Sequence, residues 1–376
     1  MMKEDISYLE NWAVLTLKNI KELKDVAIEK NATLFFSINT ATHKHSLQKP
    51  YTTPVRLLES GAICGVVVFS QIQAMIAANI AKRFVDSVLV DVEEKQGVQV
   101  DIDSKLVEHF RIKYSTKSKI NSILSAVCSI IKKDRIIEYK PNDLTVDAVW
   151  SFLSAKLNHL SGKNIAILGC GNIGSKLALK LAESGVNVIM MRRNSLKGES
   201  IVNAINLIKP SASSGLATYS SSAVQASEFC DVVISAANAN TPIVTWDVIN
   251  SMSKDGFVID IGKGNVSPDV VKNSFKHNIE IFRADITSSL YGFISHRQKI
   301  QNIVKYKMGR ARINSDISIV SGGVIGKCRE IVVDNYKTPA LIYGVSDGIG
   351  NMKTSLDSID KKNIEIVEGF INMGIY

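Results

Sequence analysis

The sequence predicts an α/β protein in which a smaller N-terminal α/β domain precedes a doubly wound Rossmann domain, with a C-terminal segment that closes the structure. The chain has 376 residues, which is more than one ordinary core accommodates. Short apolar segments typical of strands alternate with helical segments. One such strand runs directly into a glycine triplet that opens a helix. We expect domains over residues 1–145 and 146–310, followed by the segment 311–376.

The composition limits the classes of partner. The formal net charge of +9 fits a protein whose field attracts anionic small molecules. Its basic residues are spread along the chain, so we expect a small-molecule substrate and no nucleic-acid partner. The five cysteines form no CxxC pair, which predicts reduced thiols in a cytoplasmic protein and no metal site. A homo-dimer is the oligomer that we expect by default.

Residues 61–81 form an uncharged stretch that is long enough to span a bilayer. Polar side chains occur near its middle, at Ser70, Gln71, Gln73 and Asn79. We therefore expect a buried helix of the first domain that continues to about residue 84, and no membrane partner.

The first domain also contains the alternation expected of a small α/β fold. A histidine-containing loop follows its first strand, and His43 and His45 are alternative acid–base groups or substrate contacts. The elements we expect are strands at residues 32–40, 87–95 and 135–140 and a helix at residues 118–133.

The second domain has the clearer pattern. A bridging helix at residues 141–163, with an apolar stripe at Val146, Val149 and Leu153, leads into it. A buried strand, a helix that ends at Gly185 and another strand follow, up to Met191. Further strands are expected at residues 231–238, 256–264 and 279–285, then a helix at 290–308 and a hairpin plus a strand within 318–350.

The glycine triplet has the GxGxxG form, with Asn172 and Ile173 between its last two glycines. Gly169 allows a tight turn, Gly171 lets the backbone approach a pyrophosphate, and Gly174 permits close packing of helix and strand. The N-terminus of the helix then presents free N–H groups and a positive dipole to the phosphates. The alternative is a glycine turn without a ligand.

The end of the next strand indicates which dinucleotide binds. NAD-binding units place an acid there for the ribose hydroxyls, but this chain has Arg192, Arg193 and Asn194. Two guanidinium groups can bind a 2′-phosphate, which an aspartate would repel. The residues therefore predict NADP as the cofactor, and a solvated basic loop is the alternative.

Two further strand ends are expected near the nicotinamide ribose. Ala237 and Asn238 end one strand, and Gly262 ends the next. Small residues there let a ring approach closely, although ordinary loop chemistry would also account for them.

These motifs resemble the amino-acid-dehydrogenase-like superfamily. The segment around Gly162 and Lys163 reads l-x-G-K-x-x-x-I-L-G-x-G, and later strands read D-V-V-I-S-A and V-I-D-I-G. Shikimate dehydrogenases and methylenetetrahydrofolate dehydrogenases are the similar families, and the similarity spans about residues 145–264. It implies a two-domain NADP oxidoreductase that transfers a hydride to or from a C–O or C–N bond of a small polar metabolite.

The resemblance also implies catalytic residues. Thr145, Val146 and Asp147 are similar to the N-T-D motif of shikimate dehydrogenases, whose Asp pairs with a catalytic Lys. Lys95 ends a strand-to-lysine segment, although that segment lacks the family's Thr and Pro. We therefore expect Lys95 and Asp147 to shuttle a proton. The alternative function is a dinucleotide-binding regulator or sensor that has lost catalysis.

Overall fold

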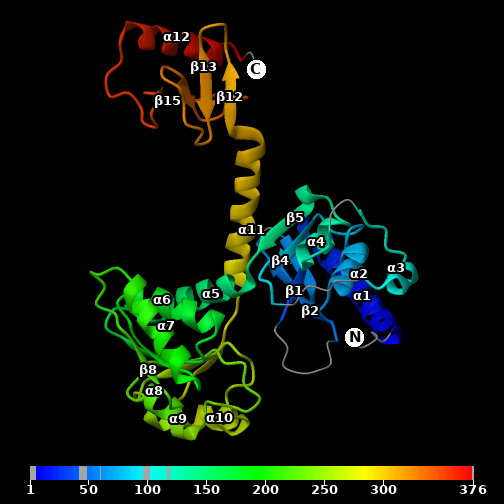
Figure 1. Cartoon of the computed structure of the whole chain (residues 1–376), viewed down its shortest axis with the longest axis vertical. Coiled ribbons are helices and arrows are strands. Elements are labelled where there is room, and N and C mark those ends of the chain that lie inside the picture. Colours follow the sequence, from blue (N-terminus) through cyan, green and yellow to red (C-terminus); the bar gives the residue numbers. More distant parts are fainter. Residues whose placement is uncertain (1–5, 42–48, 60, 96–101, 117–118, 375–376) are drawn as a thin grey trace. The chain divides into compact units, whose positions relative to one another are not determined.

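A computed structural model describes residues 6–41, 49–59, 61–95, 102–116 and 119–374 (Figure 1). The loop with His43 and His45, predicted to hold alternative acid–base groups, lies outside the described residues. The chain forms two compact units, residues 1–291 and residues 292–376. The first unit contains two sheets and the second contains one.

The first sheet has the order β2-β3-β1-β4-β5. Four of its strands run parallel, and only β2 pairs in the antiparallel sense, with β3. The carboxyl ends of the parallel strands therefore lie at one edge of the sheet, where ligands bind in such folds. The strands are β1 (Thr33–Thr40), β2 (Tyr51–Leu58), β3 (Gly61–Val68), β4 (Ser87–Asp91) and β5 (Ile136–Tyr139).

The uncharged stretch 61–81, predicted as one helix, is a strand followed by a helix, so that prediction was wrong. Strand β3 is buried along its whole length, and α2 (Gln71–Ala81) begins after Ser70, whose side chain caps it. A Cβ at Gly65 would lie 2.3 Å from the Ser37 carbonyl oxygen, so glycine lets β3 approach β1. The valines that follow favour a strand. None of the described helices combines the length and apolarity needed to cross a bilayer.

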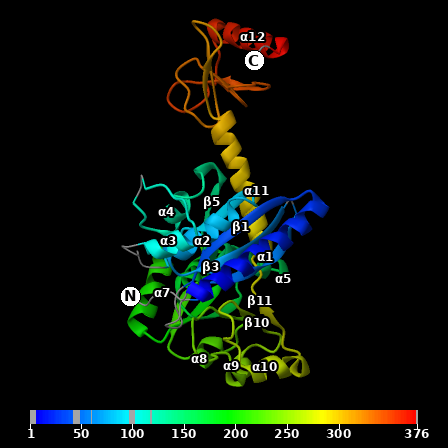
Figure 2. The same ribbon diagram turned by 90° about the vertical axis from the view of Figure 1, so that its right-hand side faces the viewer.

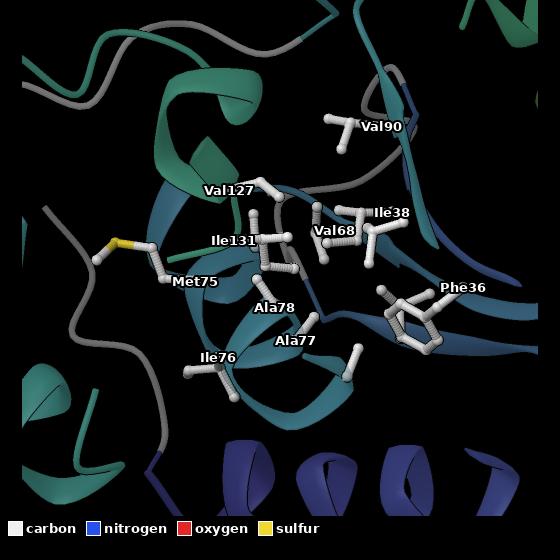
Figure 3. Packing of buried hydrophobic residues seen from close by; sticks show 14 of the residues in the cluster. Phe36, Ile38, Val68, Met75, Ile76, Ala77, Ala78, Val90, Val127 and Ile131 are labelled. Atoms are coloured by element: carbon white, nitrogen blue, oxygen red, sulfur yellow. The ribbon is translucent and has the colours of Figure 1, made fainter. Parts of the chain in front are cut away.

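Helices cover the first sheet. Helix α1 (Ile6–Lys30), which the sequence analysis did not predict, buries Leu9, Trp12, Ile20 and Leu23 at helical spacing. Figure 2 shows α1 running along the sheet beside β1 and β3. Side chains of α2, Val127 and Ile131 pack with strand side chains in the core (Figure 3). The other helices here are α3 (Ser104–His109), α4 (Ile123–Cys128) and the 3-10 helix η1 (Lys133–Arg135).

The second sheet is the predicted doubly wound Rossmann sheet, so the predicted fold class is confirmed. Its order is β11-β10-β9-β6-β7-β8, and every adjacent pair is parallel. The strand order reverses between β6 and β9, the point at which such sheets bind ligands. The strands are β6 (Asn164–Leu168), β7 (Asn187–Met191), β8 (Ala217–Ser220), β9 (Val232–Ser235), β10 (Phe257–Asp260) and β11 (Ile281–Arg283).

The helices of this sheet begin with the predicted bridge. Helix α5 (Pro141–Lys156) has Pro141 in its first turn and no side-chain cap among the described residues, and it buries the predicted stripe. Helix α6 (Asn172–Glu183) follows the glycine triplet. The others are α7 (Ser195–Ile208), α8 (Ala223–Ser227), α9 (Trp246–Ser251), α10 (Pro268–Asn273) and the 3-10 helix η2 (Ser274–His277).

The second unit contains the sheet β12-β13-β14-β15. The expected hairpin within residues 318–334 is absent, because β13 and β14 are parallel neighbours. Helix α12 lies against this sheet and buries Val367 with Ile319 and Ile331 (Figure 1). Its elements follow α11 (Thr287–Asn302) and the π-helix η3 (Ile303–Lys307), and they are β12 (Gly309–Arg312), β13 (Ser318–Ser321), β14 (Ile331–Val333), β15 (Ile342–Val345) and α12 (Ser358–Met373).

Candidate active site

A cavity of about 1080 Å³ lies within the first unit. The Rossmann sheet contributes residues 169–173, 191–194 and 236–239, which follow β6, β7 and β9. The first sheet contributes residues 92–95 after β4, together with Thr40 at the end of β1 and Lys140 after β5, and Asn142 of α5 also lines the cavity. Strand ends of both sheets therefore line one cavity, which is the arrangement needed to bring a cofactor to a substrate.

The three glycines have different roles in the turn after β6. Gly169 has φ +122°, and a Cβ there would lie 2.5 Å from the Ala237 nitrogen. A Cβ at Gly174 would lie 2.0 Å from the Gly169 oxygen. At Gly171, by contrast, no described atom other than those of Gly171 and its two chain neighbours lies within 4 Å of that position. The protein's own packing therefore requires the first and third glycines, whereas the second leaves space that a ligand could fill.

The N-terminus of α6 meets the cavity at Asn172 and Ile173. Gly171 occupies the N-cap position, and no described side chain caps the helix. The first turn contains no acid. Its N–H groups and the helix dipole therefore suit an anion such as a pyrophosphate.

The arginines after β7 differ in their contacts. The Arg192 guanidinium donates to the Cys170 carbonyl, and the Tyr219 hydroxyl donates to the Arg192 carbonyl at 2.9 Å. Arg193 is exposed and lines the cavity. Asn194 also lines it, but its Oδ1 accepts from Lys197 N at 2.9 Å and caps α7. Arg192 thus braces the glycine turn, which leaves Arg193 as the exposed guanidinium at this end.

The two strand ends expected near the nicotinamide lie next to each other. Ala237 and Asn238 line the cavity. Gly262 is not among its described lining residues, and a Cβ there would lie 2.3 Å from the Ala237 oxygen. The Asn265 amide also donates to that oxygen, at 2.9 Å. Gly262 therefore packs closely against the loop after β9.

The structure does not bring Lys95 and Asp147 together. Lys95 lines the cavity, whereas Asp147 is not among the described residues that line it. The Asp147 carboxylate is 51% exposed and pairs with Lys180 on α6. The Lys95 ammonium instead lies 2.8 Å from Asp91 Oδ2 and 2.9 Å from Glu93 Oε2. The expected pairing of Lys95 with Asp147 is therefore corrected: Lys95 pairs with Asp91, at the end of β4, and with Glu93 in the loop that follows.

Asp91, which contacts Lys95, is a residue that the sequence predictions did not include. Its side chain is fully buried at the end of β4. One carboxylate oxygen accepts from Thr40 N at 3.0 Å and from Thr40 Oγ1 at 2.6 Å, and the other accepts from Glu93 N at 2.8 Å. An acid that ends a buried strand four residues before a lysine was the available signal.

Burial and the carboxylates of Asp91 and Glu93 affect the pKa of Tyr139, on β5. Burial raises the pKa of Tyr139, and the charges of Asp91 and Glu93 raise it further. The Tyr139 hydroxyl donates to Asn39 Oδ1. Tyr139 is therefore a neutral hydrogen-bonding group here and no acid–base candidate at neutral pH.

No group of three or more His, Cys, Asp or Glu residues within the described ranges could hold a metal ion.

Fold and cavity together define an α/β protein whose doubly wound Rossmann sheet contributes a glycine turn to the cavity. Residues 151–284 match the family model described as shikimate / quinate 5-dehydrogenase. The predicted resemblance to this superfamily is thereby confirmed. No curated protein matches the chain in sequence.

Solved structures show similarity at low identity. The CAD from Helicobacter pylori complexed with NADP(H) is 16% identical, with 48% of this chain and 46% of that chain covered and a TM-score of 0.31. A shikimate dehydrogenase in complex with NADP+ is 15% identical, with 73% and 90% covered and a TM-score of 0.38. The dipicolinate synthase A chain from Bacillus subtilis is 12% identical, with 73% and 98% covered and a TM-score of 0.34. The chain thus spans about half the length of the first of these.

Proposed function

We propose that the protein is an NADP-dependent oxidoreductase that transfers a hydride to or from a C–O or C–N bond of a small polar metabolite. The observation that carries this proposal is the single cavity lined by both the glycine turn and Lys95. The family match over residues 151–284 supports a dehydrogenase-type cofactor domain. The first sheet would then supply the substrate side of the cavity.

The residues present fit a dinucleotide. Gly171 and the uncapped start of α6 would hold the pyrophosphate, since space and free N–H groups are both available there. Arg193 would bind the 2′-phosphate, while Arg192 holds the turn. Ala237 and Asn238 would lie beside the nicotinamide ribose. The bound cofactor would supply or accept the hydride.

Lys95 would be the proton donor. Its Nζ lies within 3 Å of two carboxylates, those of Asp91 and Glu93, which hold it in place. In reduction, the substrate carbon gains the hydride, and its oxygen or nitrogen takes a proton from Lys95 Nζ. In oxidation, the neutral amine takes that proton back. Asp91, which accepts two hydrogen bonds from Thr40, would fix the position of the amine of Lys95, a residue that lines the cavity.

Calorimetric titration of the full-length protein with NADP and with NAD tests the cofactor assignment. We expect saturable binding that is tighter for NADP. Binding of neither dinucleotide at millimolar concentration would overturn the proposal. Steady-state NADPH consumption with a panel of keto, imino and folate substrates then tests catalysis, and binding without any turnover would favour the regulator or sensor.

A further inference from the structure

Glu93 is a second acid at Lys95, and its contacts extend beyond its own loop. Its side chain is 11% exposed. Oε2 lies 2.9 Å from Lys95 Nζ and accepts from Asn142 N, in the first turn of α5, at 3.2 Å. Oε1 lies 3.9 Å from Lys176 Nζ, on α6. One carboxylate thus contacts the proposed proton donor, the bridging helix and the glycine-turn helix.

Neutralising Lys95 does not require this carboxylate. Asp91 already places an oxygen 2.8 Å from Lys95 Nζ. Desolvating a further carboxylate costs several kcal/mol unless it is well paired. Moreover, Glu93 Oε1 has no hydrogen-bond partner among the described residues. A largely buried acid that lies between two lysines and has one oxygen without a described hydrogen bond indicates a role other than stability.

The contacts of Lys176 and Asn142 connect this acid to the cofactor side. Lys176 follows the glycine turn on α6 and also pairs with Asp143 of α5. The Asn142 amide donates to Asn172 Oδ1 at 3.2 Å, in the first turn of α6. Lys176 and Asn142 therefore each connect Glu93 to α6, the helix whose N-terminus would bind the pyrophosphate.

We propose that Glu93 is a positioning residue that orients the Lys95 ammonium and links it electrostatically to the cofactor-binding helix through Lys176. The role given to Glu93 rests on the proposed function, but the experiment that tests it does not. Asp91 and Glu93 contact Lys95 directly, and the other charged residues that line its cavity are Glu94, Lys140, Lys176, Arg192 and Arg193.

The test measures the titration of the Lys95 amine directly. Full-length protein without any dinucleotide is trace-labelled with acetic anhydride across a pH series, and peptide mass spectrometry reads acetylation at each lysine. In Glu93→Gln we expect the Lys95 midpoint to move down by about one pH unit, since one opposite charge is lost. Glu93→Asp, which keeps the charge, should restore part of that shift.

Lys180 provides the matched control, because Asp147 is its acid partner and neither belongs to the cavity lining described. Asp147→Asn should lower the Lys180 midpoint slightly and leave Lys95 unchanged. An unshifted Lys95 midpoint in folded Glu93→Gln overturns the inference. Since no dinucleotide is present, this outcome does not depend on whether the proposed function holds.

A second variant covers the case in which Glu93→Gln does not fold. Lys176→Met removes a cation 3.9 Å from Glu93. The Lys95 midpoint should then rise, because Glu93 and Lys95 interact without a competing cation. A Lys95 midpoint equal to that of the wild type would remove the proposed link to α6.

Discussion

The first unit contains two lysine–aspartate ion pairs whose surroundings differ. In the Lys95–Asp91 pair the carboxylate is fully buried, and the lysine lines the cavity. In the Lys180–Asp147 pair the aspartate is 51% exposed. Exposed pairs contribute about 0–1 kcal/mol to stability, whereas losing one partner of a buried pair costs about 3–5 kcal/mol. Burial at a strand end therefore separates a candidate catalytic pair from a surface pair.

Removing the lysine of the buried pair should have the largest effect. Lys95→Met deletes the proposed proton donor, and general acid–base catalysis contributes about 10²–10⁴-fold to such reactions. We expect turnover of NADPH to fall at least ~100-fold, with NADP binding by calorimetry intact. The matched change Lys180→Met should leave turnover near the wild-type rate; equal losses in both variants would erase the distinction between the pairs.

The glycine turn offers the next largest effect. In Gly171→Ala the new Cβ meets no described atom within 4 Å, so the fold should persist. The methyl group would instead stand where the pyrophosphate approaches, at a cost of about 1.5–3 kcal/mol in charge-assisted hydrogen bonds, or ~10–100-fold in the Kd. Calorimetry with NADP measures this loss.

Gly369 serves as the control for that substitution, because it also has open space around its Cβ position but lies in α12 of the second unit. Gly369→Ala should bind NADP like the wild type. A Gly171→Ala protein of unchanged affinity would argue against a phosphate at this turn.

Substitutions of the two arginines after β7 should distinguish a loss of affinity for both dinucleotides from a loss of the preference for NADP. Arg193→Ser removes the exposed guanidinium, so we expect NADP to bind about tenfold more weakly, as for one lost charge-assisted contact, while NAD affinity stays constant. Arg192→Ser removes the brace on Cys170 and should weaken both dinucleotides. Parallel titrations measure both, and equal losses for NADP and NAD in Arg193→Ser would contradict the assignment.

The same contrast explains how much of the site the sequence predicts. The glycine turn and the residues after β7 and β9 follow from local rules, because one short segment determines each of them. Lys95 could be identified, but its partner could not. Asp147 fits a family motif in sequence, yet α5 directs it to Lys180. Asp91 meets Lys95 within one segment, four residues apart, whereas the position of Asp147 relative to Lys95 depends on how α5 packs.

The fold shows a similar limit. The Rossmann strands were predicted because buried parallel strands are continuous apolar runs with small residues at their ends. Residues 61–81 are equally apolar, and apolarity alone does not distinguish a buried strand from a buried helix. The close approach of Gly65 to Ser37 and the cap at Ser70 decide that case, and both depend on the folded structure.

Alkaline pH should destabilise the protein through its buried thiols. Burial raises the pKa of Cys64 and Cys230 to about 12 and that of Cys170 to about 11. A thiol in the unfolded chain titrates near ~8.5, so the unfolded state loses protons first. The three buried thiols therefore stabilise the fold fully below about pH 8.5. This contribution declines as the pH rises towards their pKa values in the folded protein. Urea midpoints between pH 8 and 11 measure the decline, which Cys170→Ser should make shallower.

The smallest effect is expected at the exposed pair. Asp147→Asn should change the free energy of unfolding by no more than about 1 kcal/mol, since its partner Lys180 stays solvated, and turnover should remain at the wild-type level. Asp91→Asn is the counterpart: it leaves the Thr40 hydroxyl and Lys95 with a weaker acceptor in a buried place, so both stability and turnover should fall. Urea unfolding and NADPH consumption of the two variants provide the comparison. A loss of turnover in Asp147→Asn, with Asp91→Asn active, would return Asp147 to the catalytic role implied by its motif.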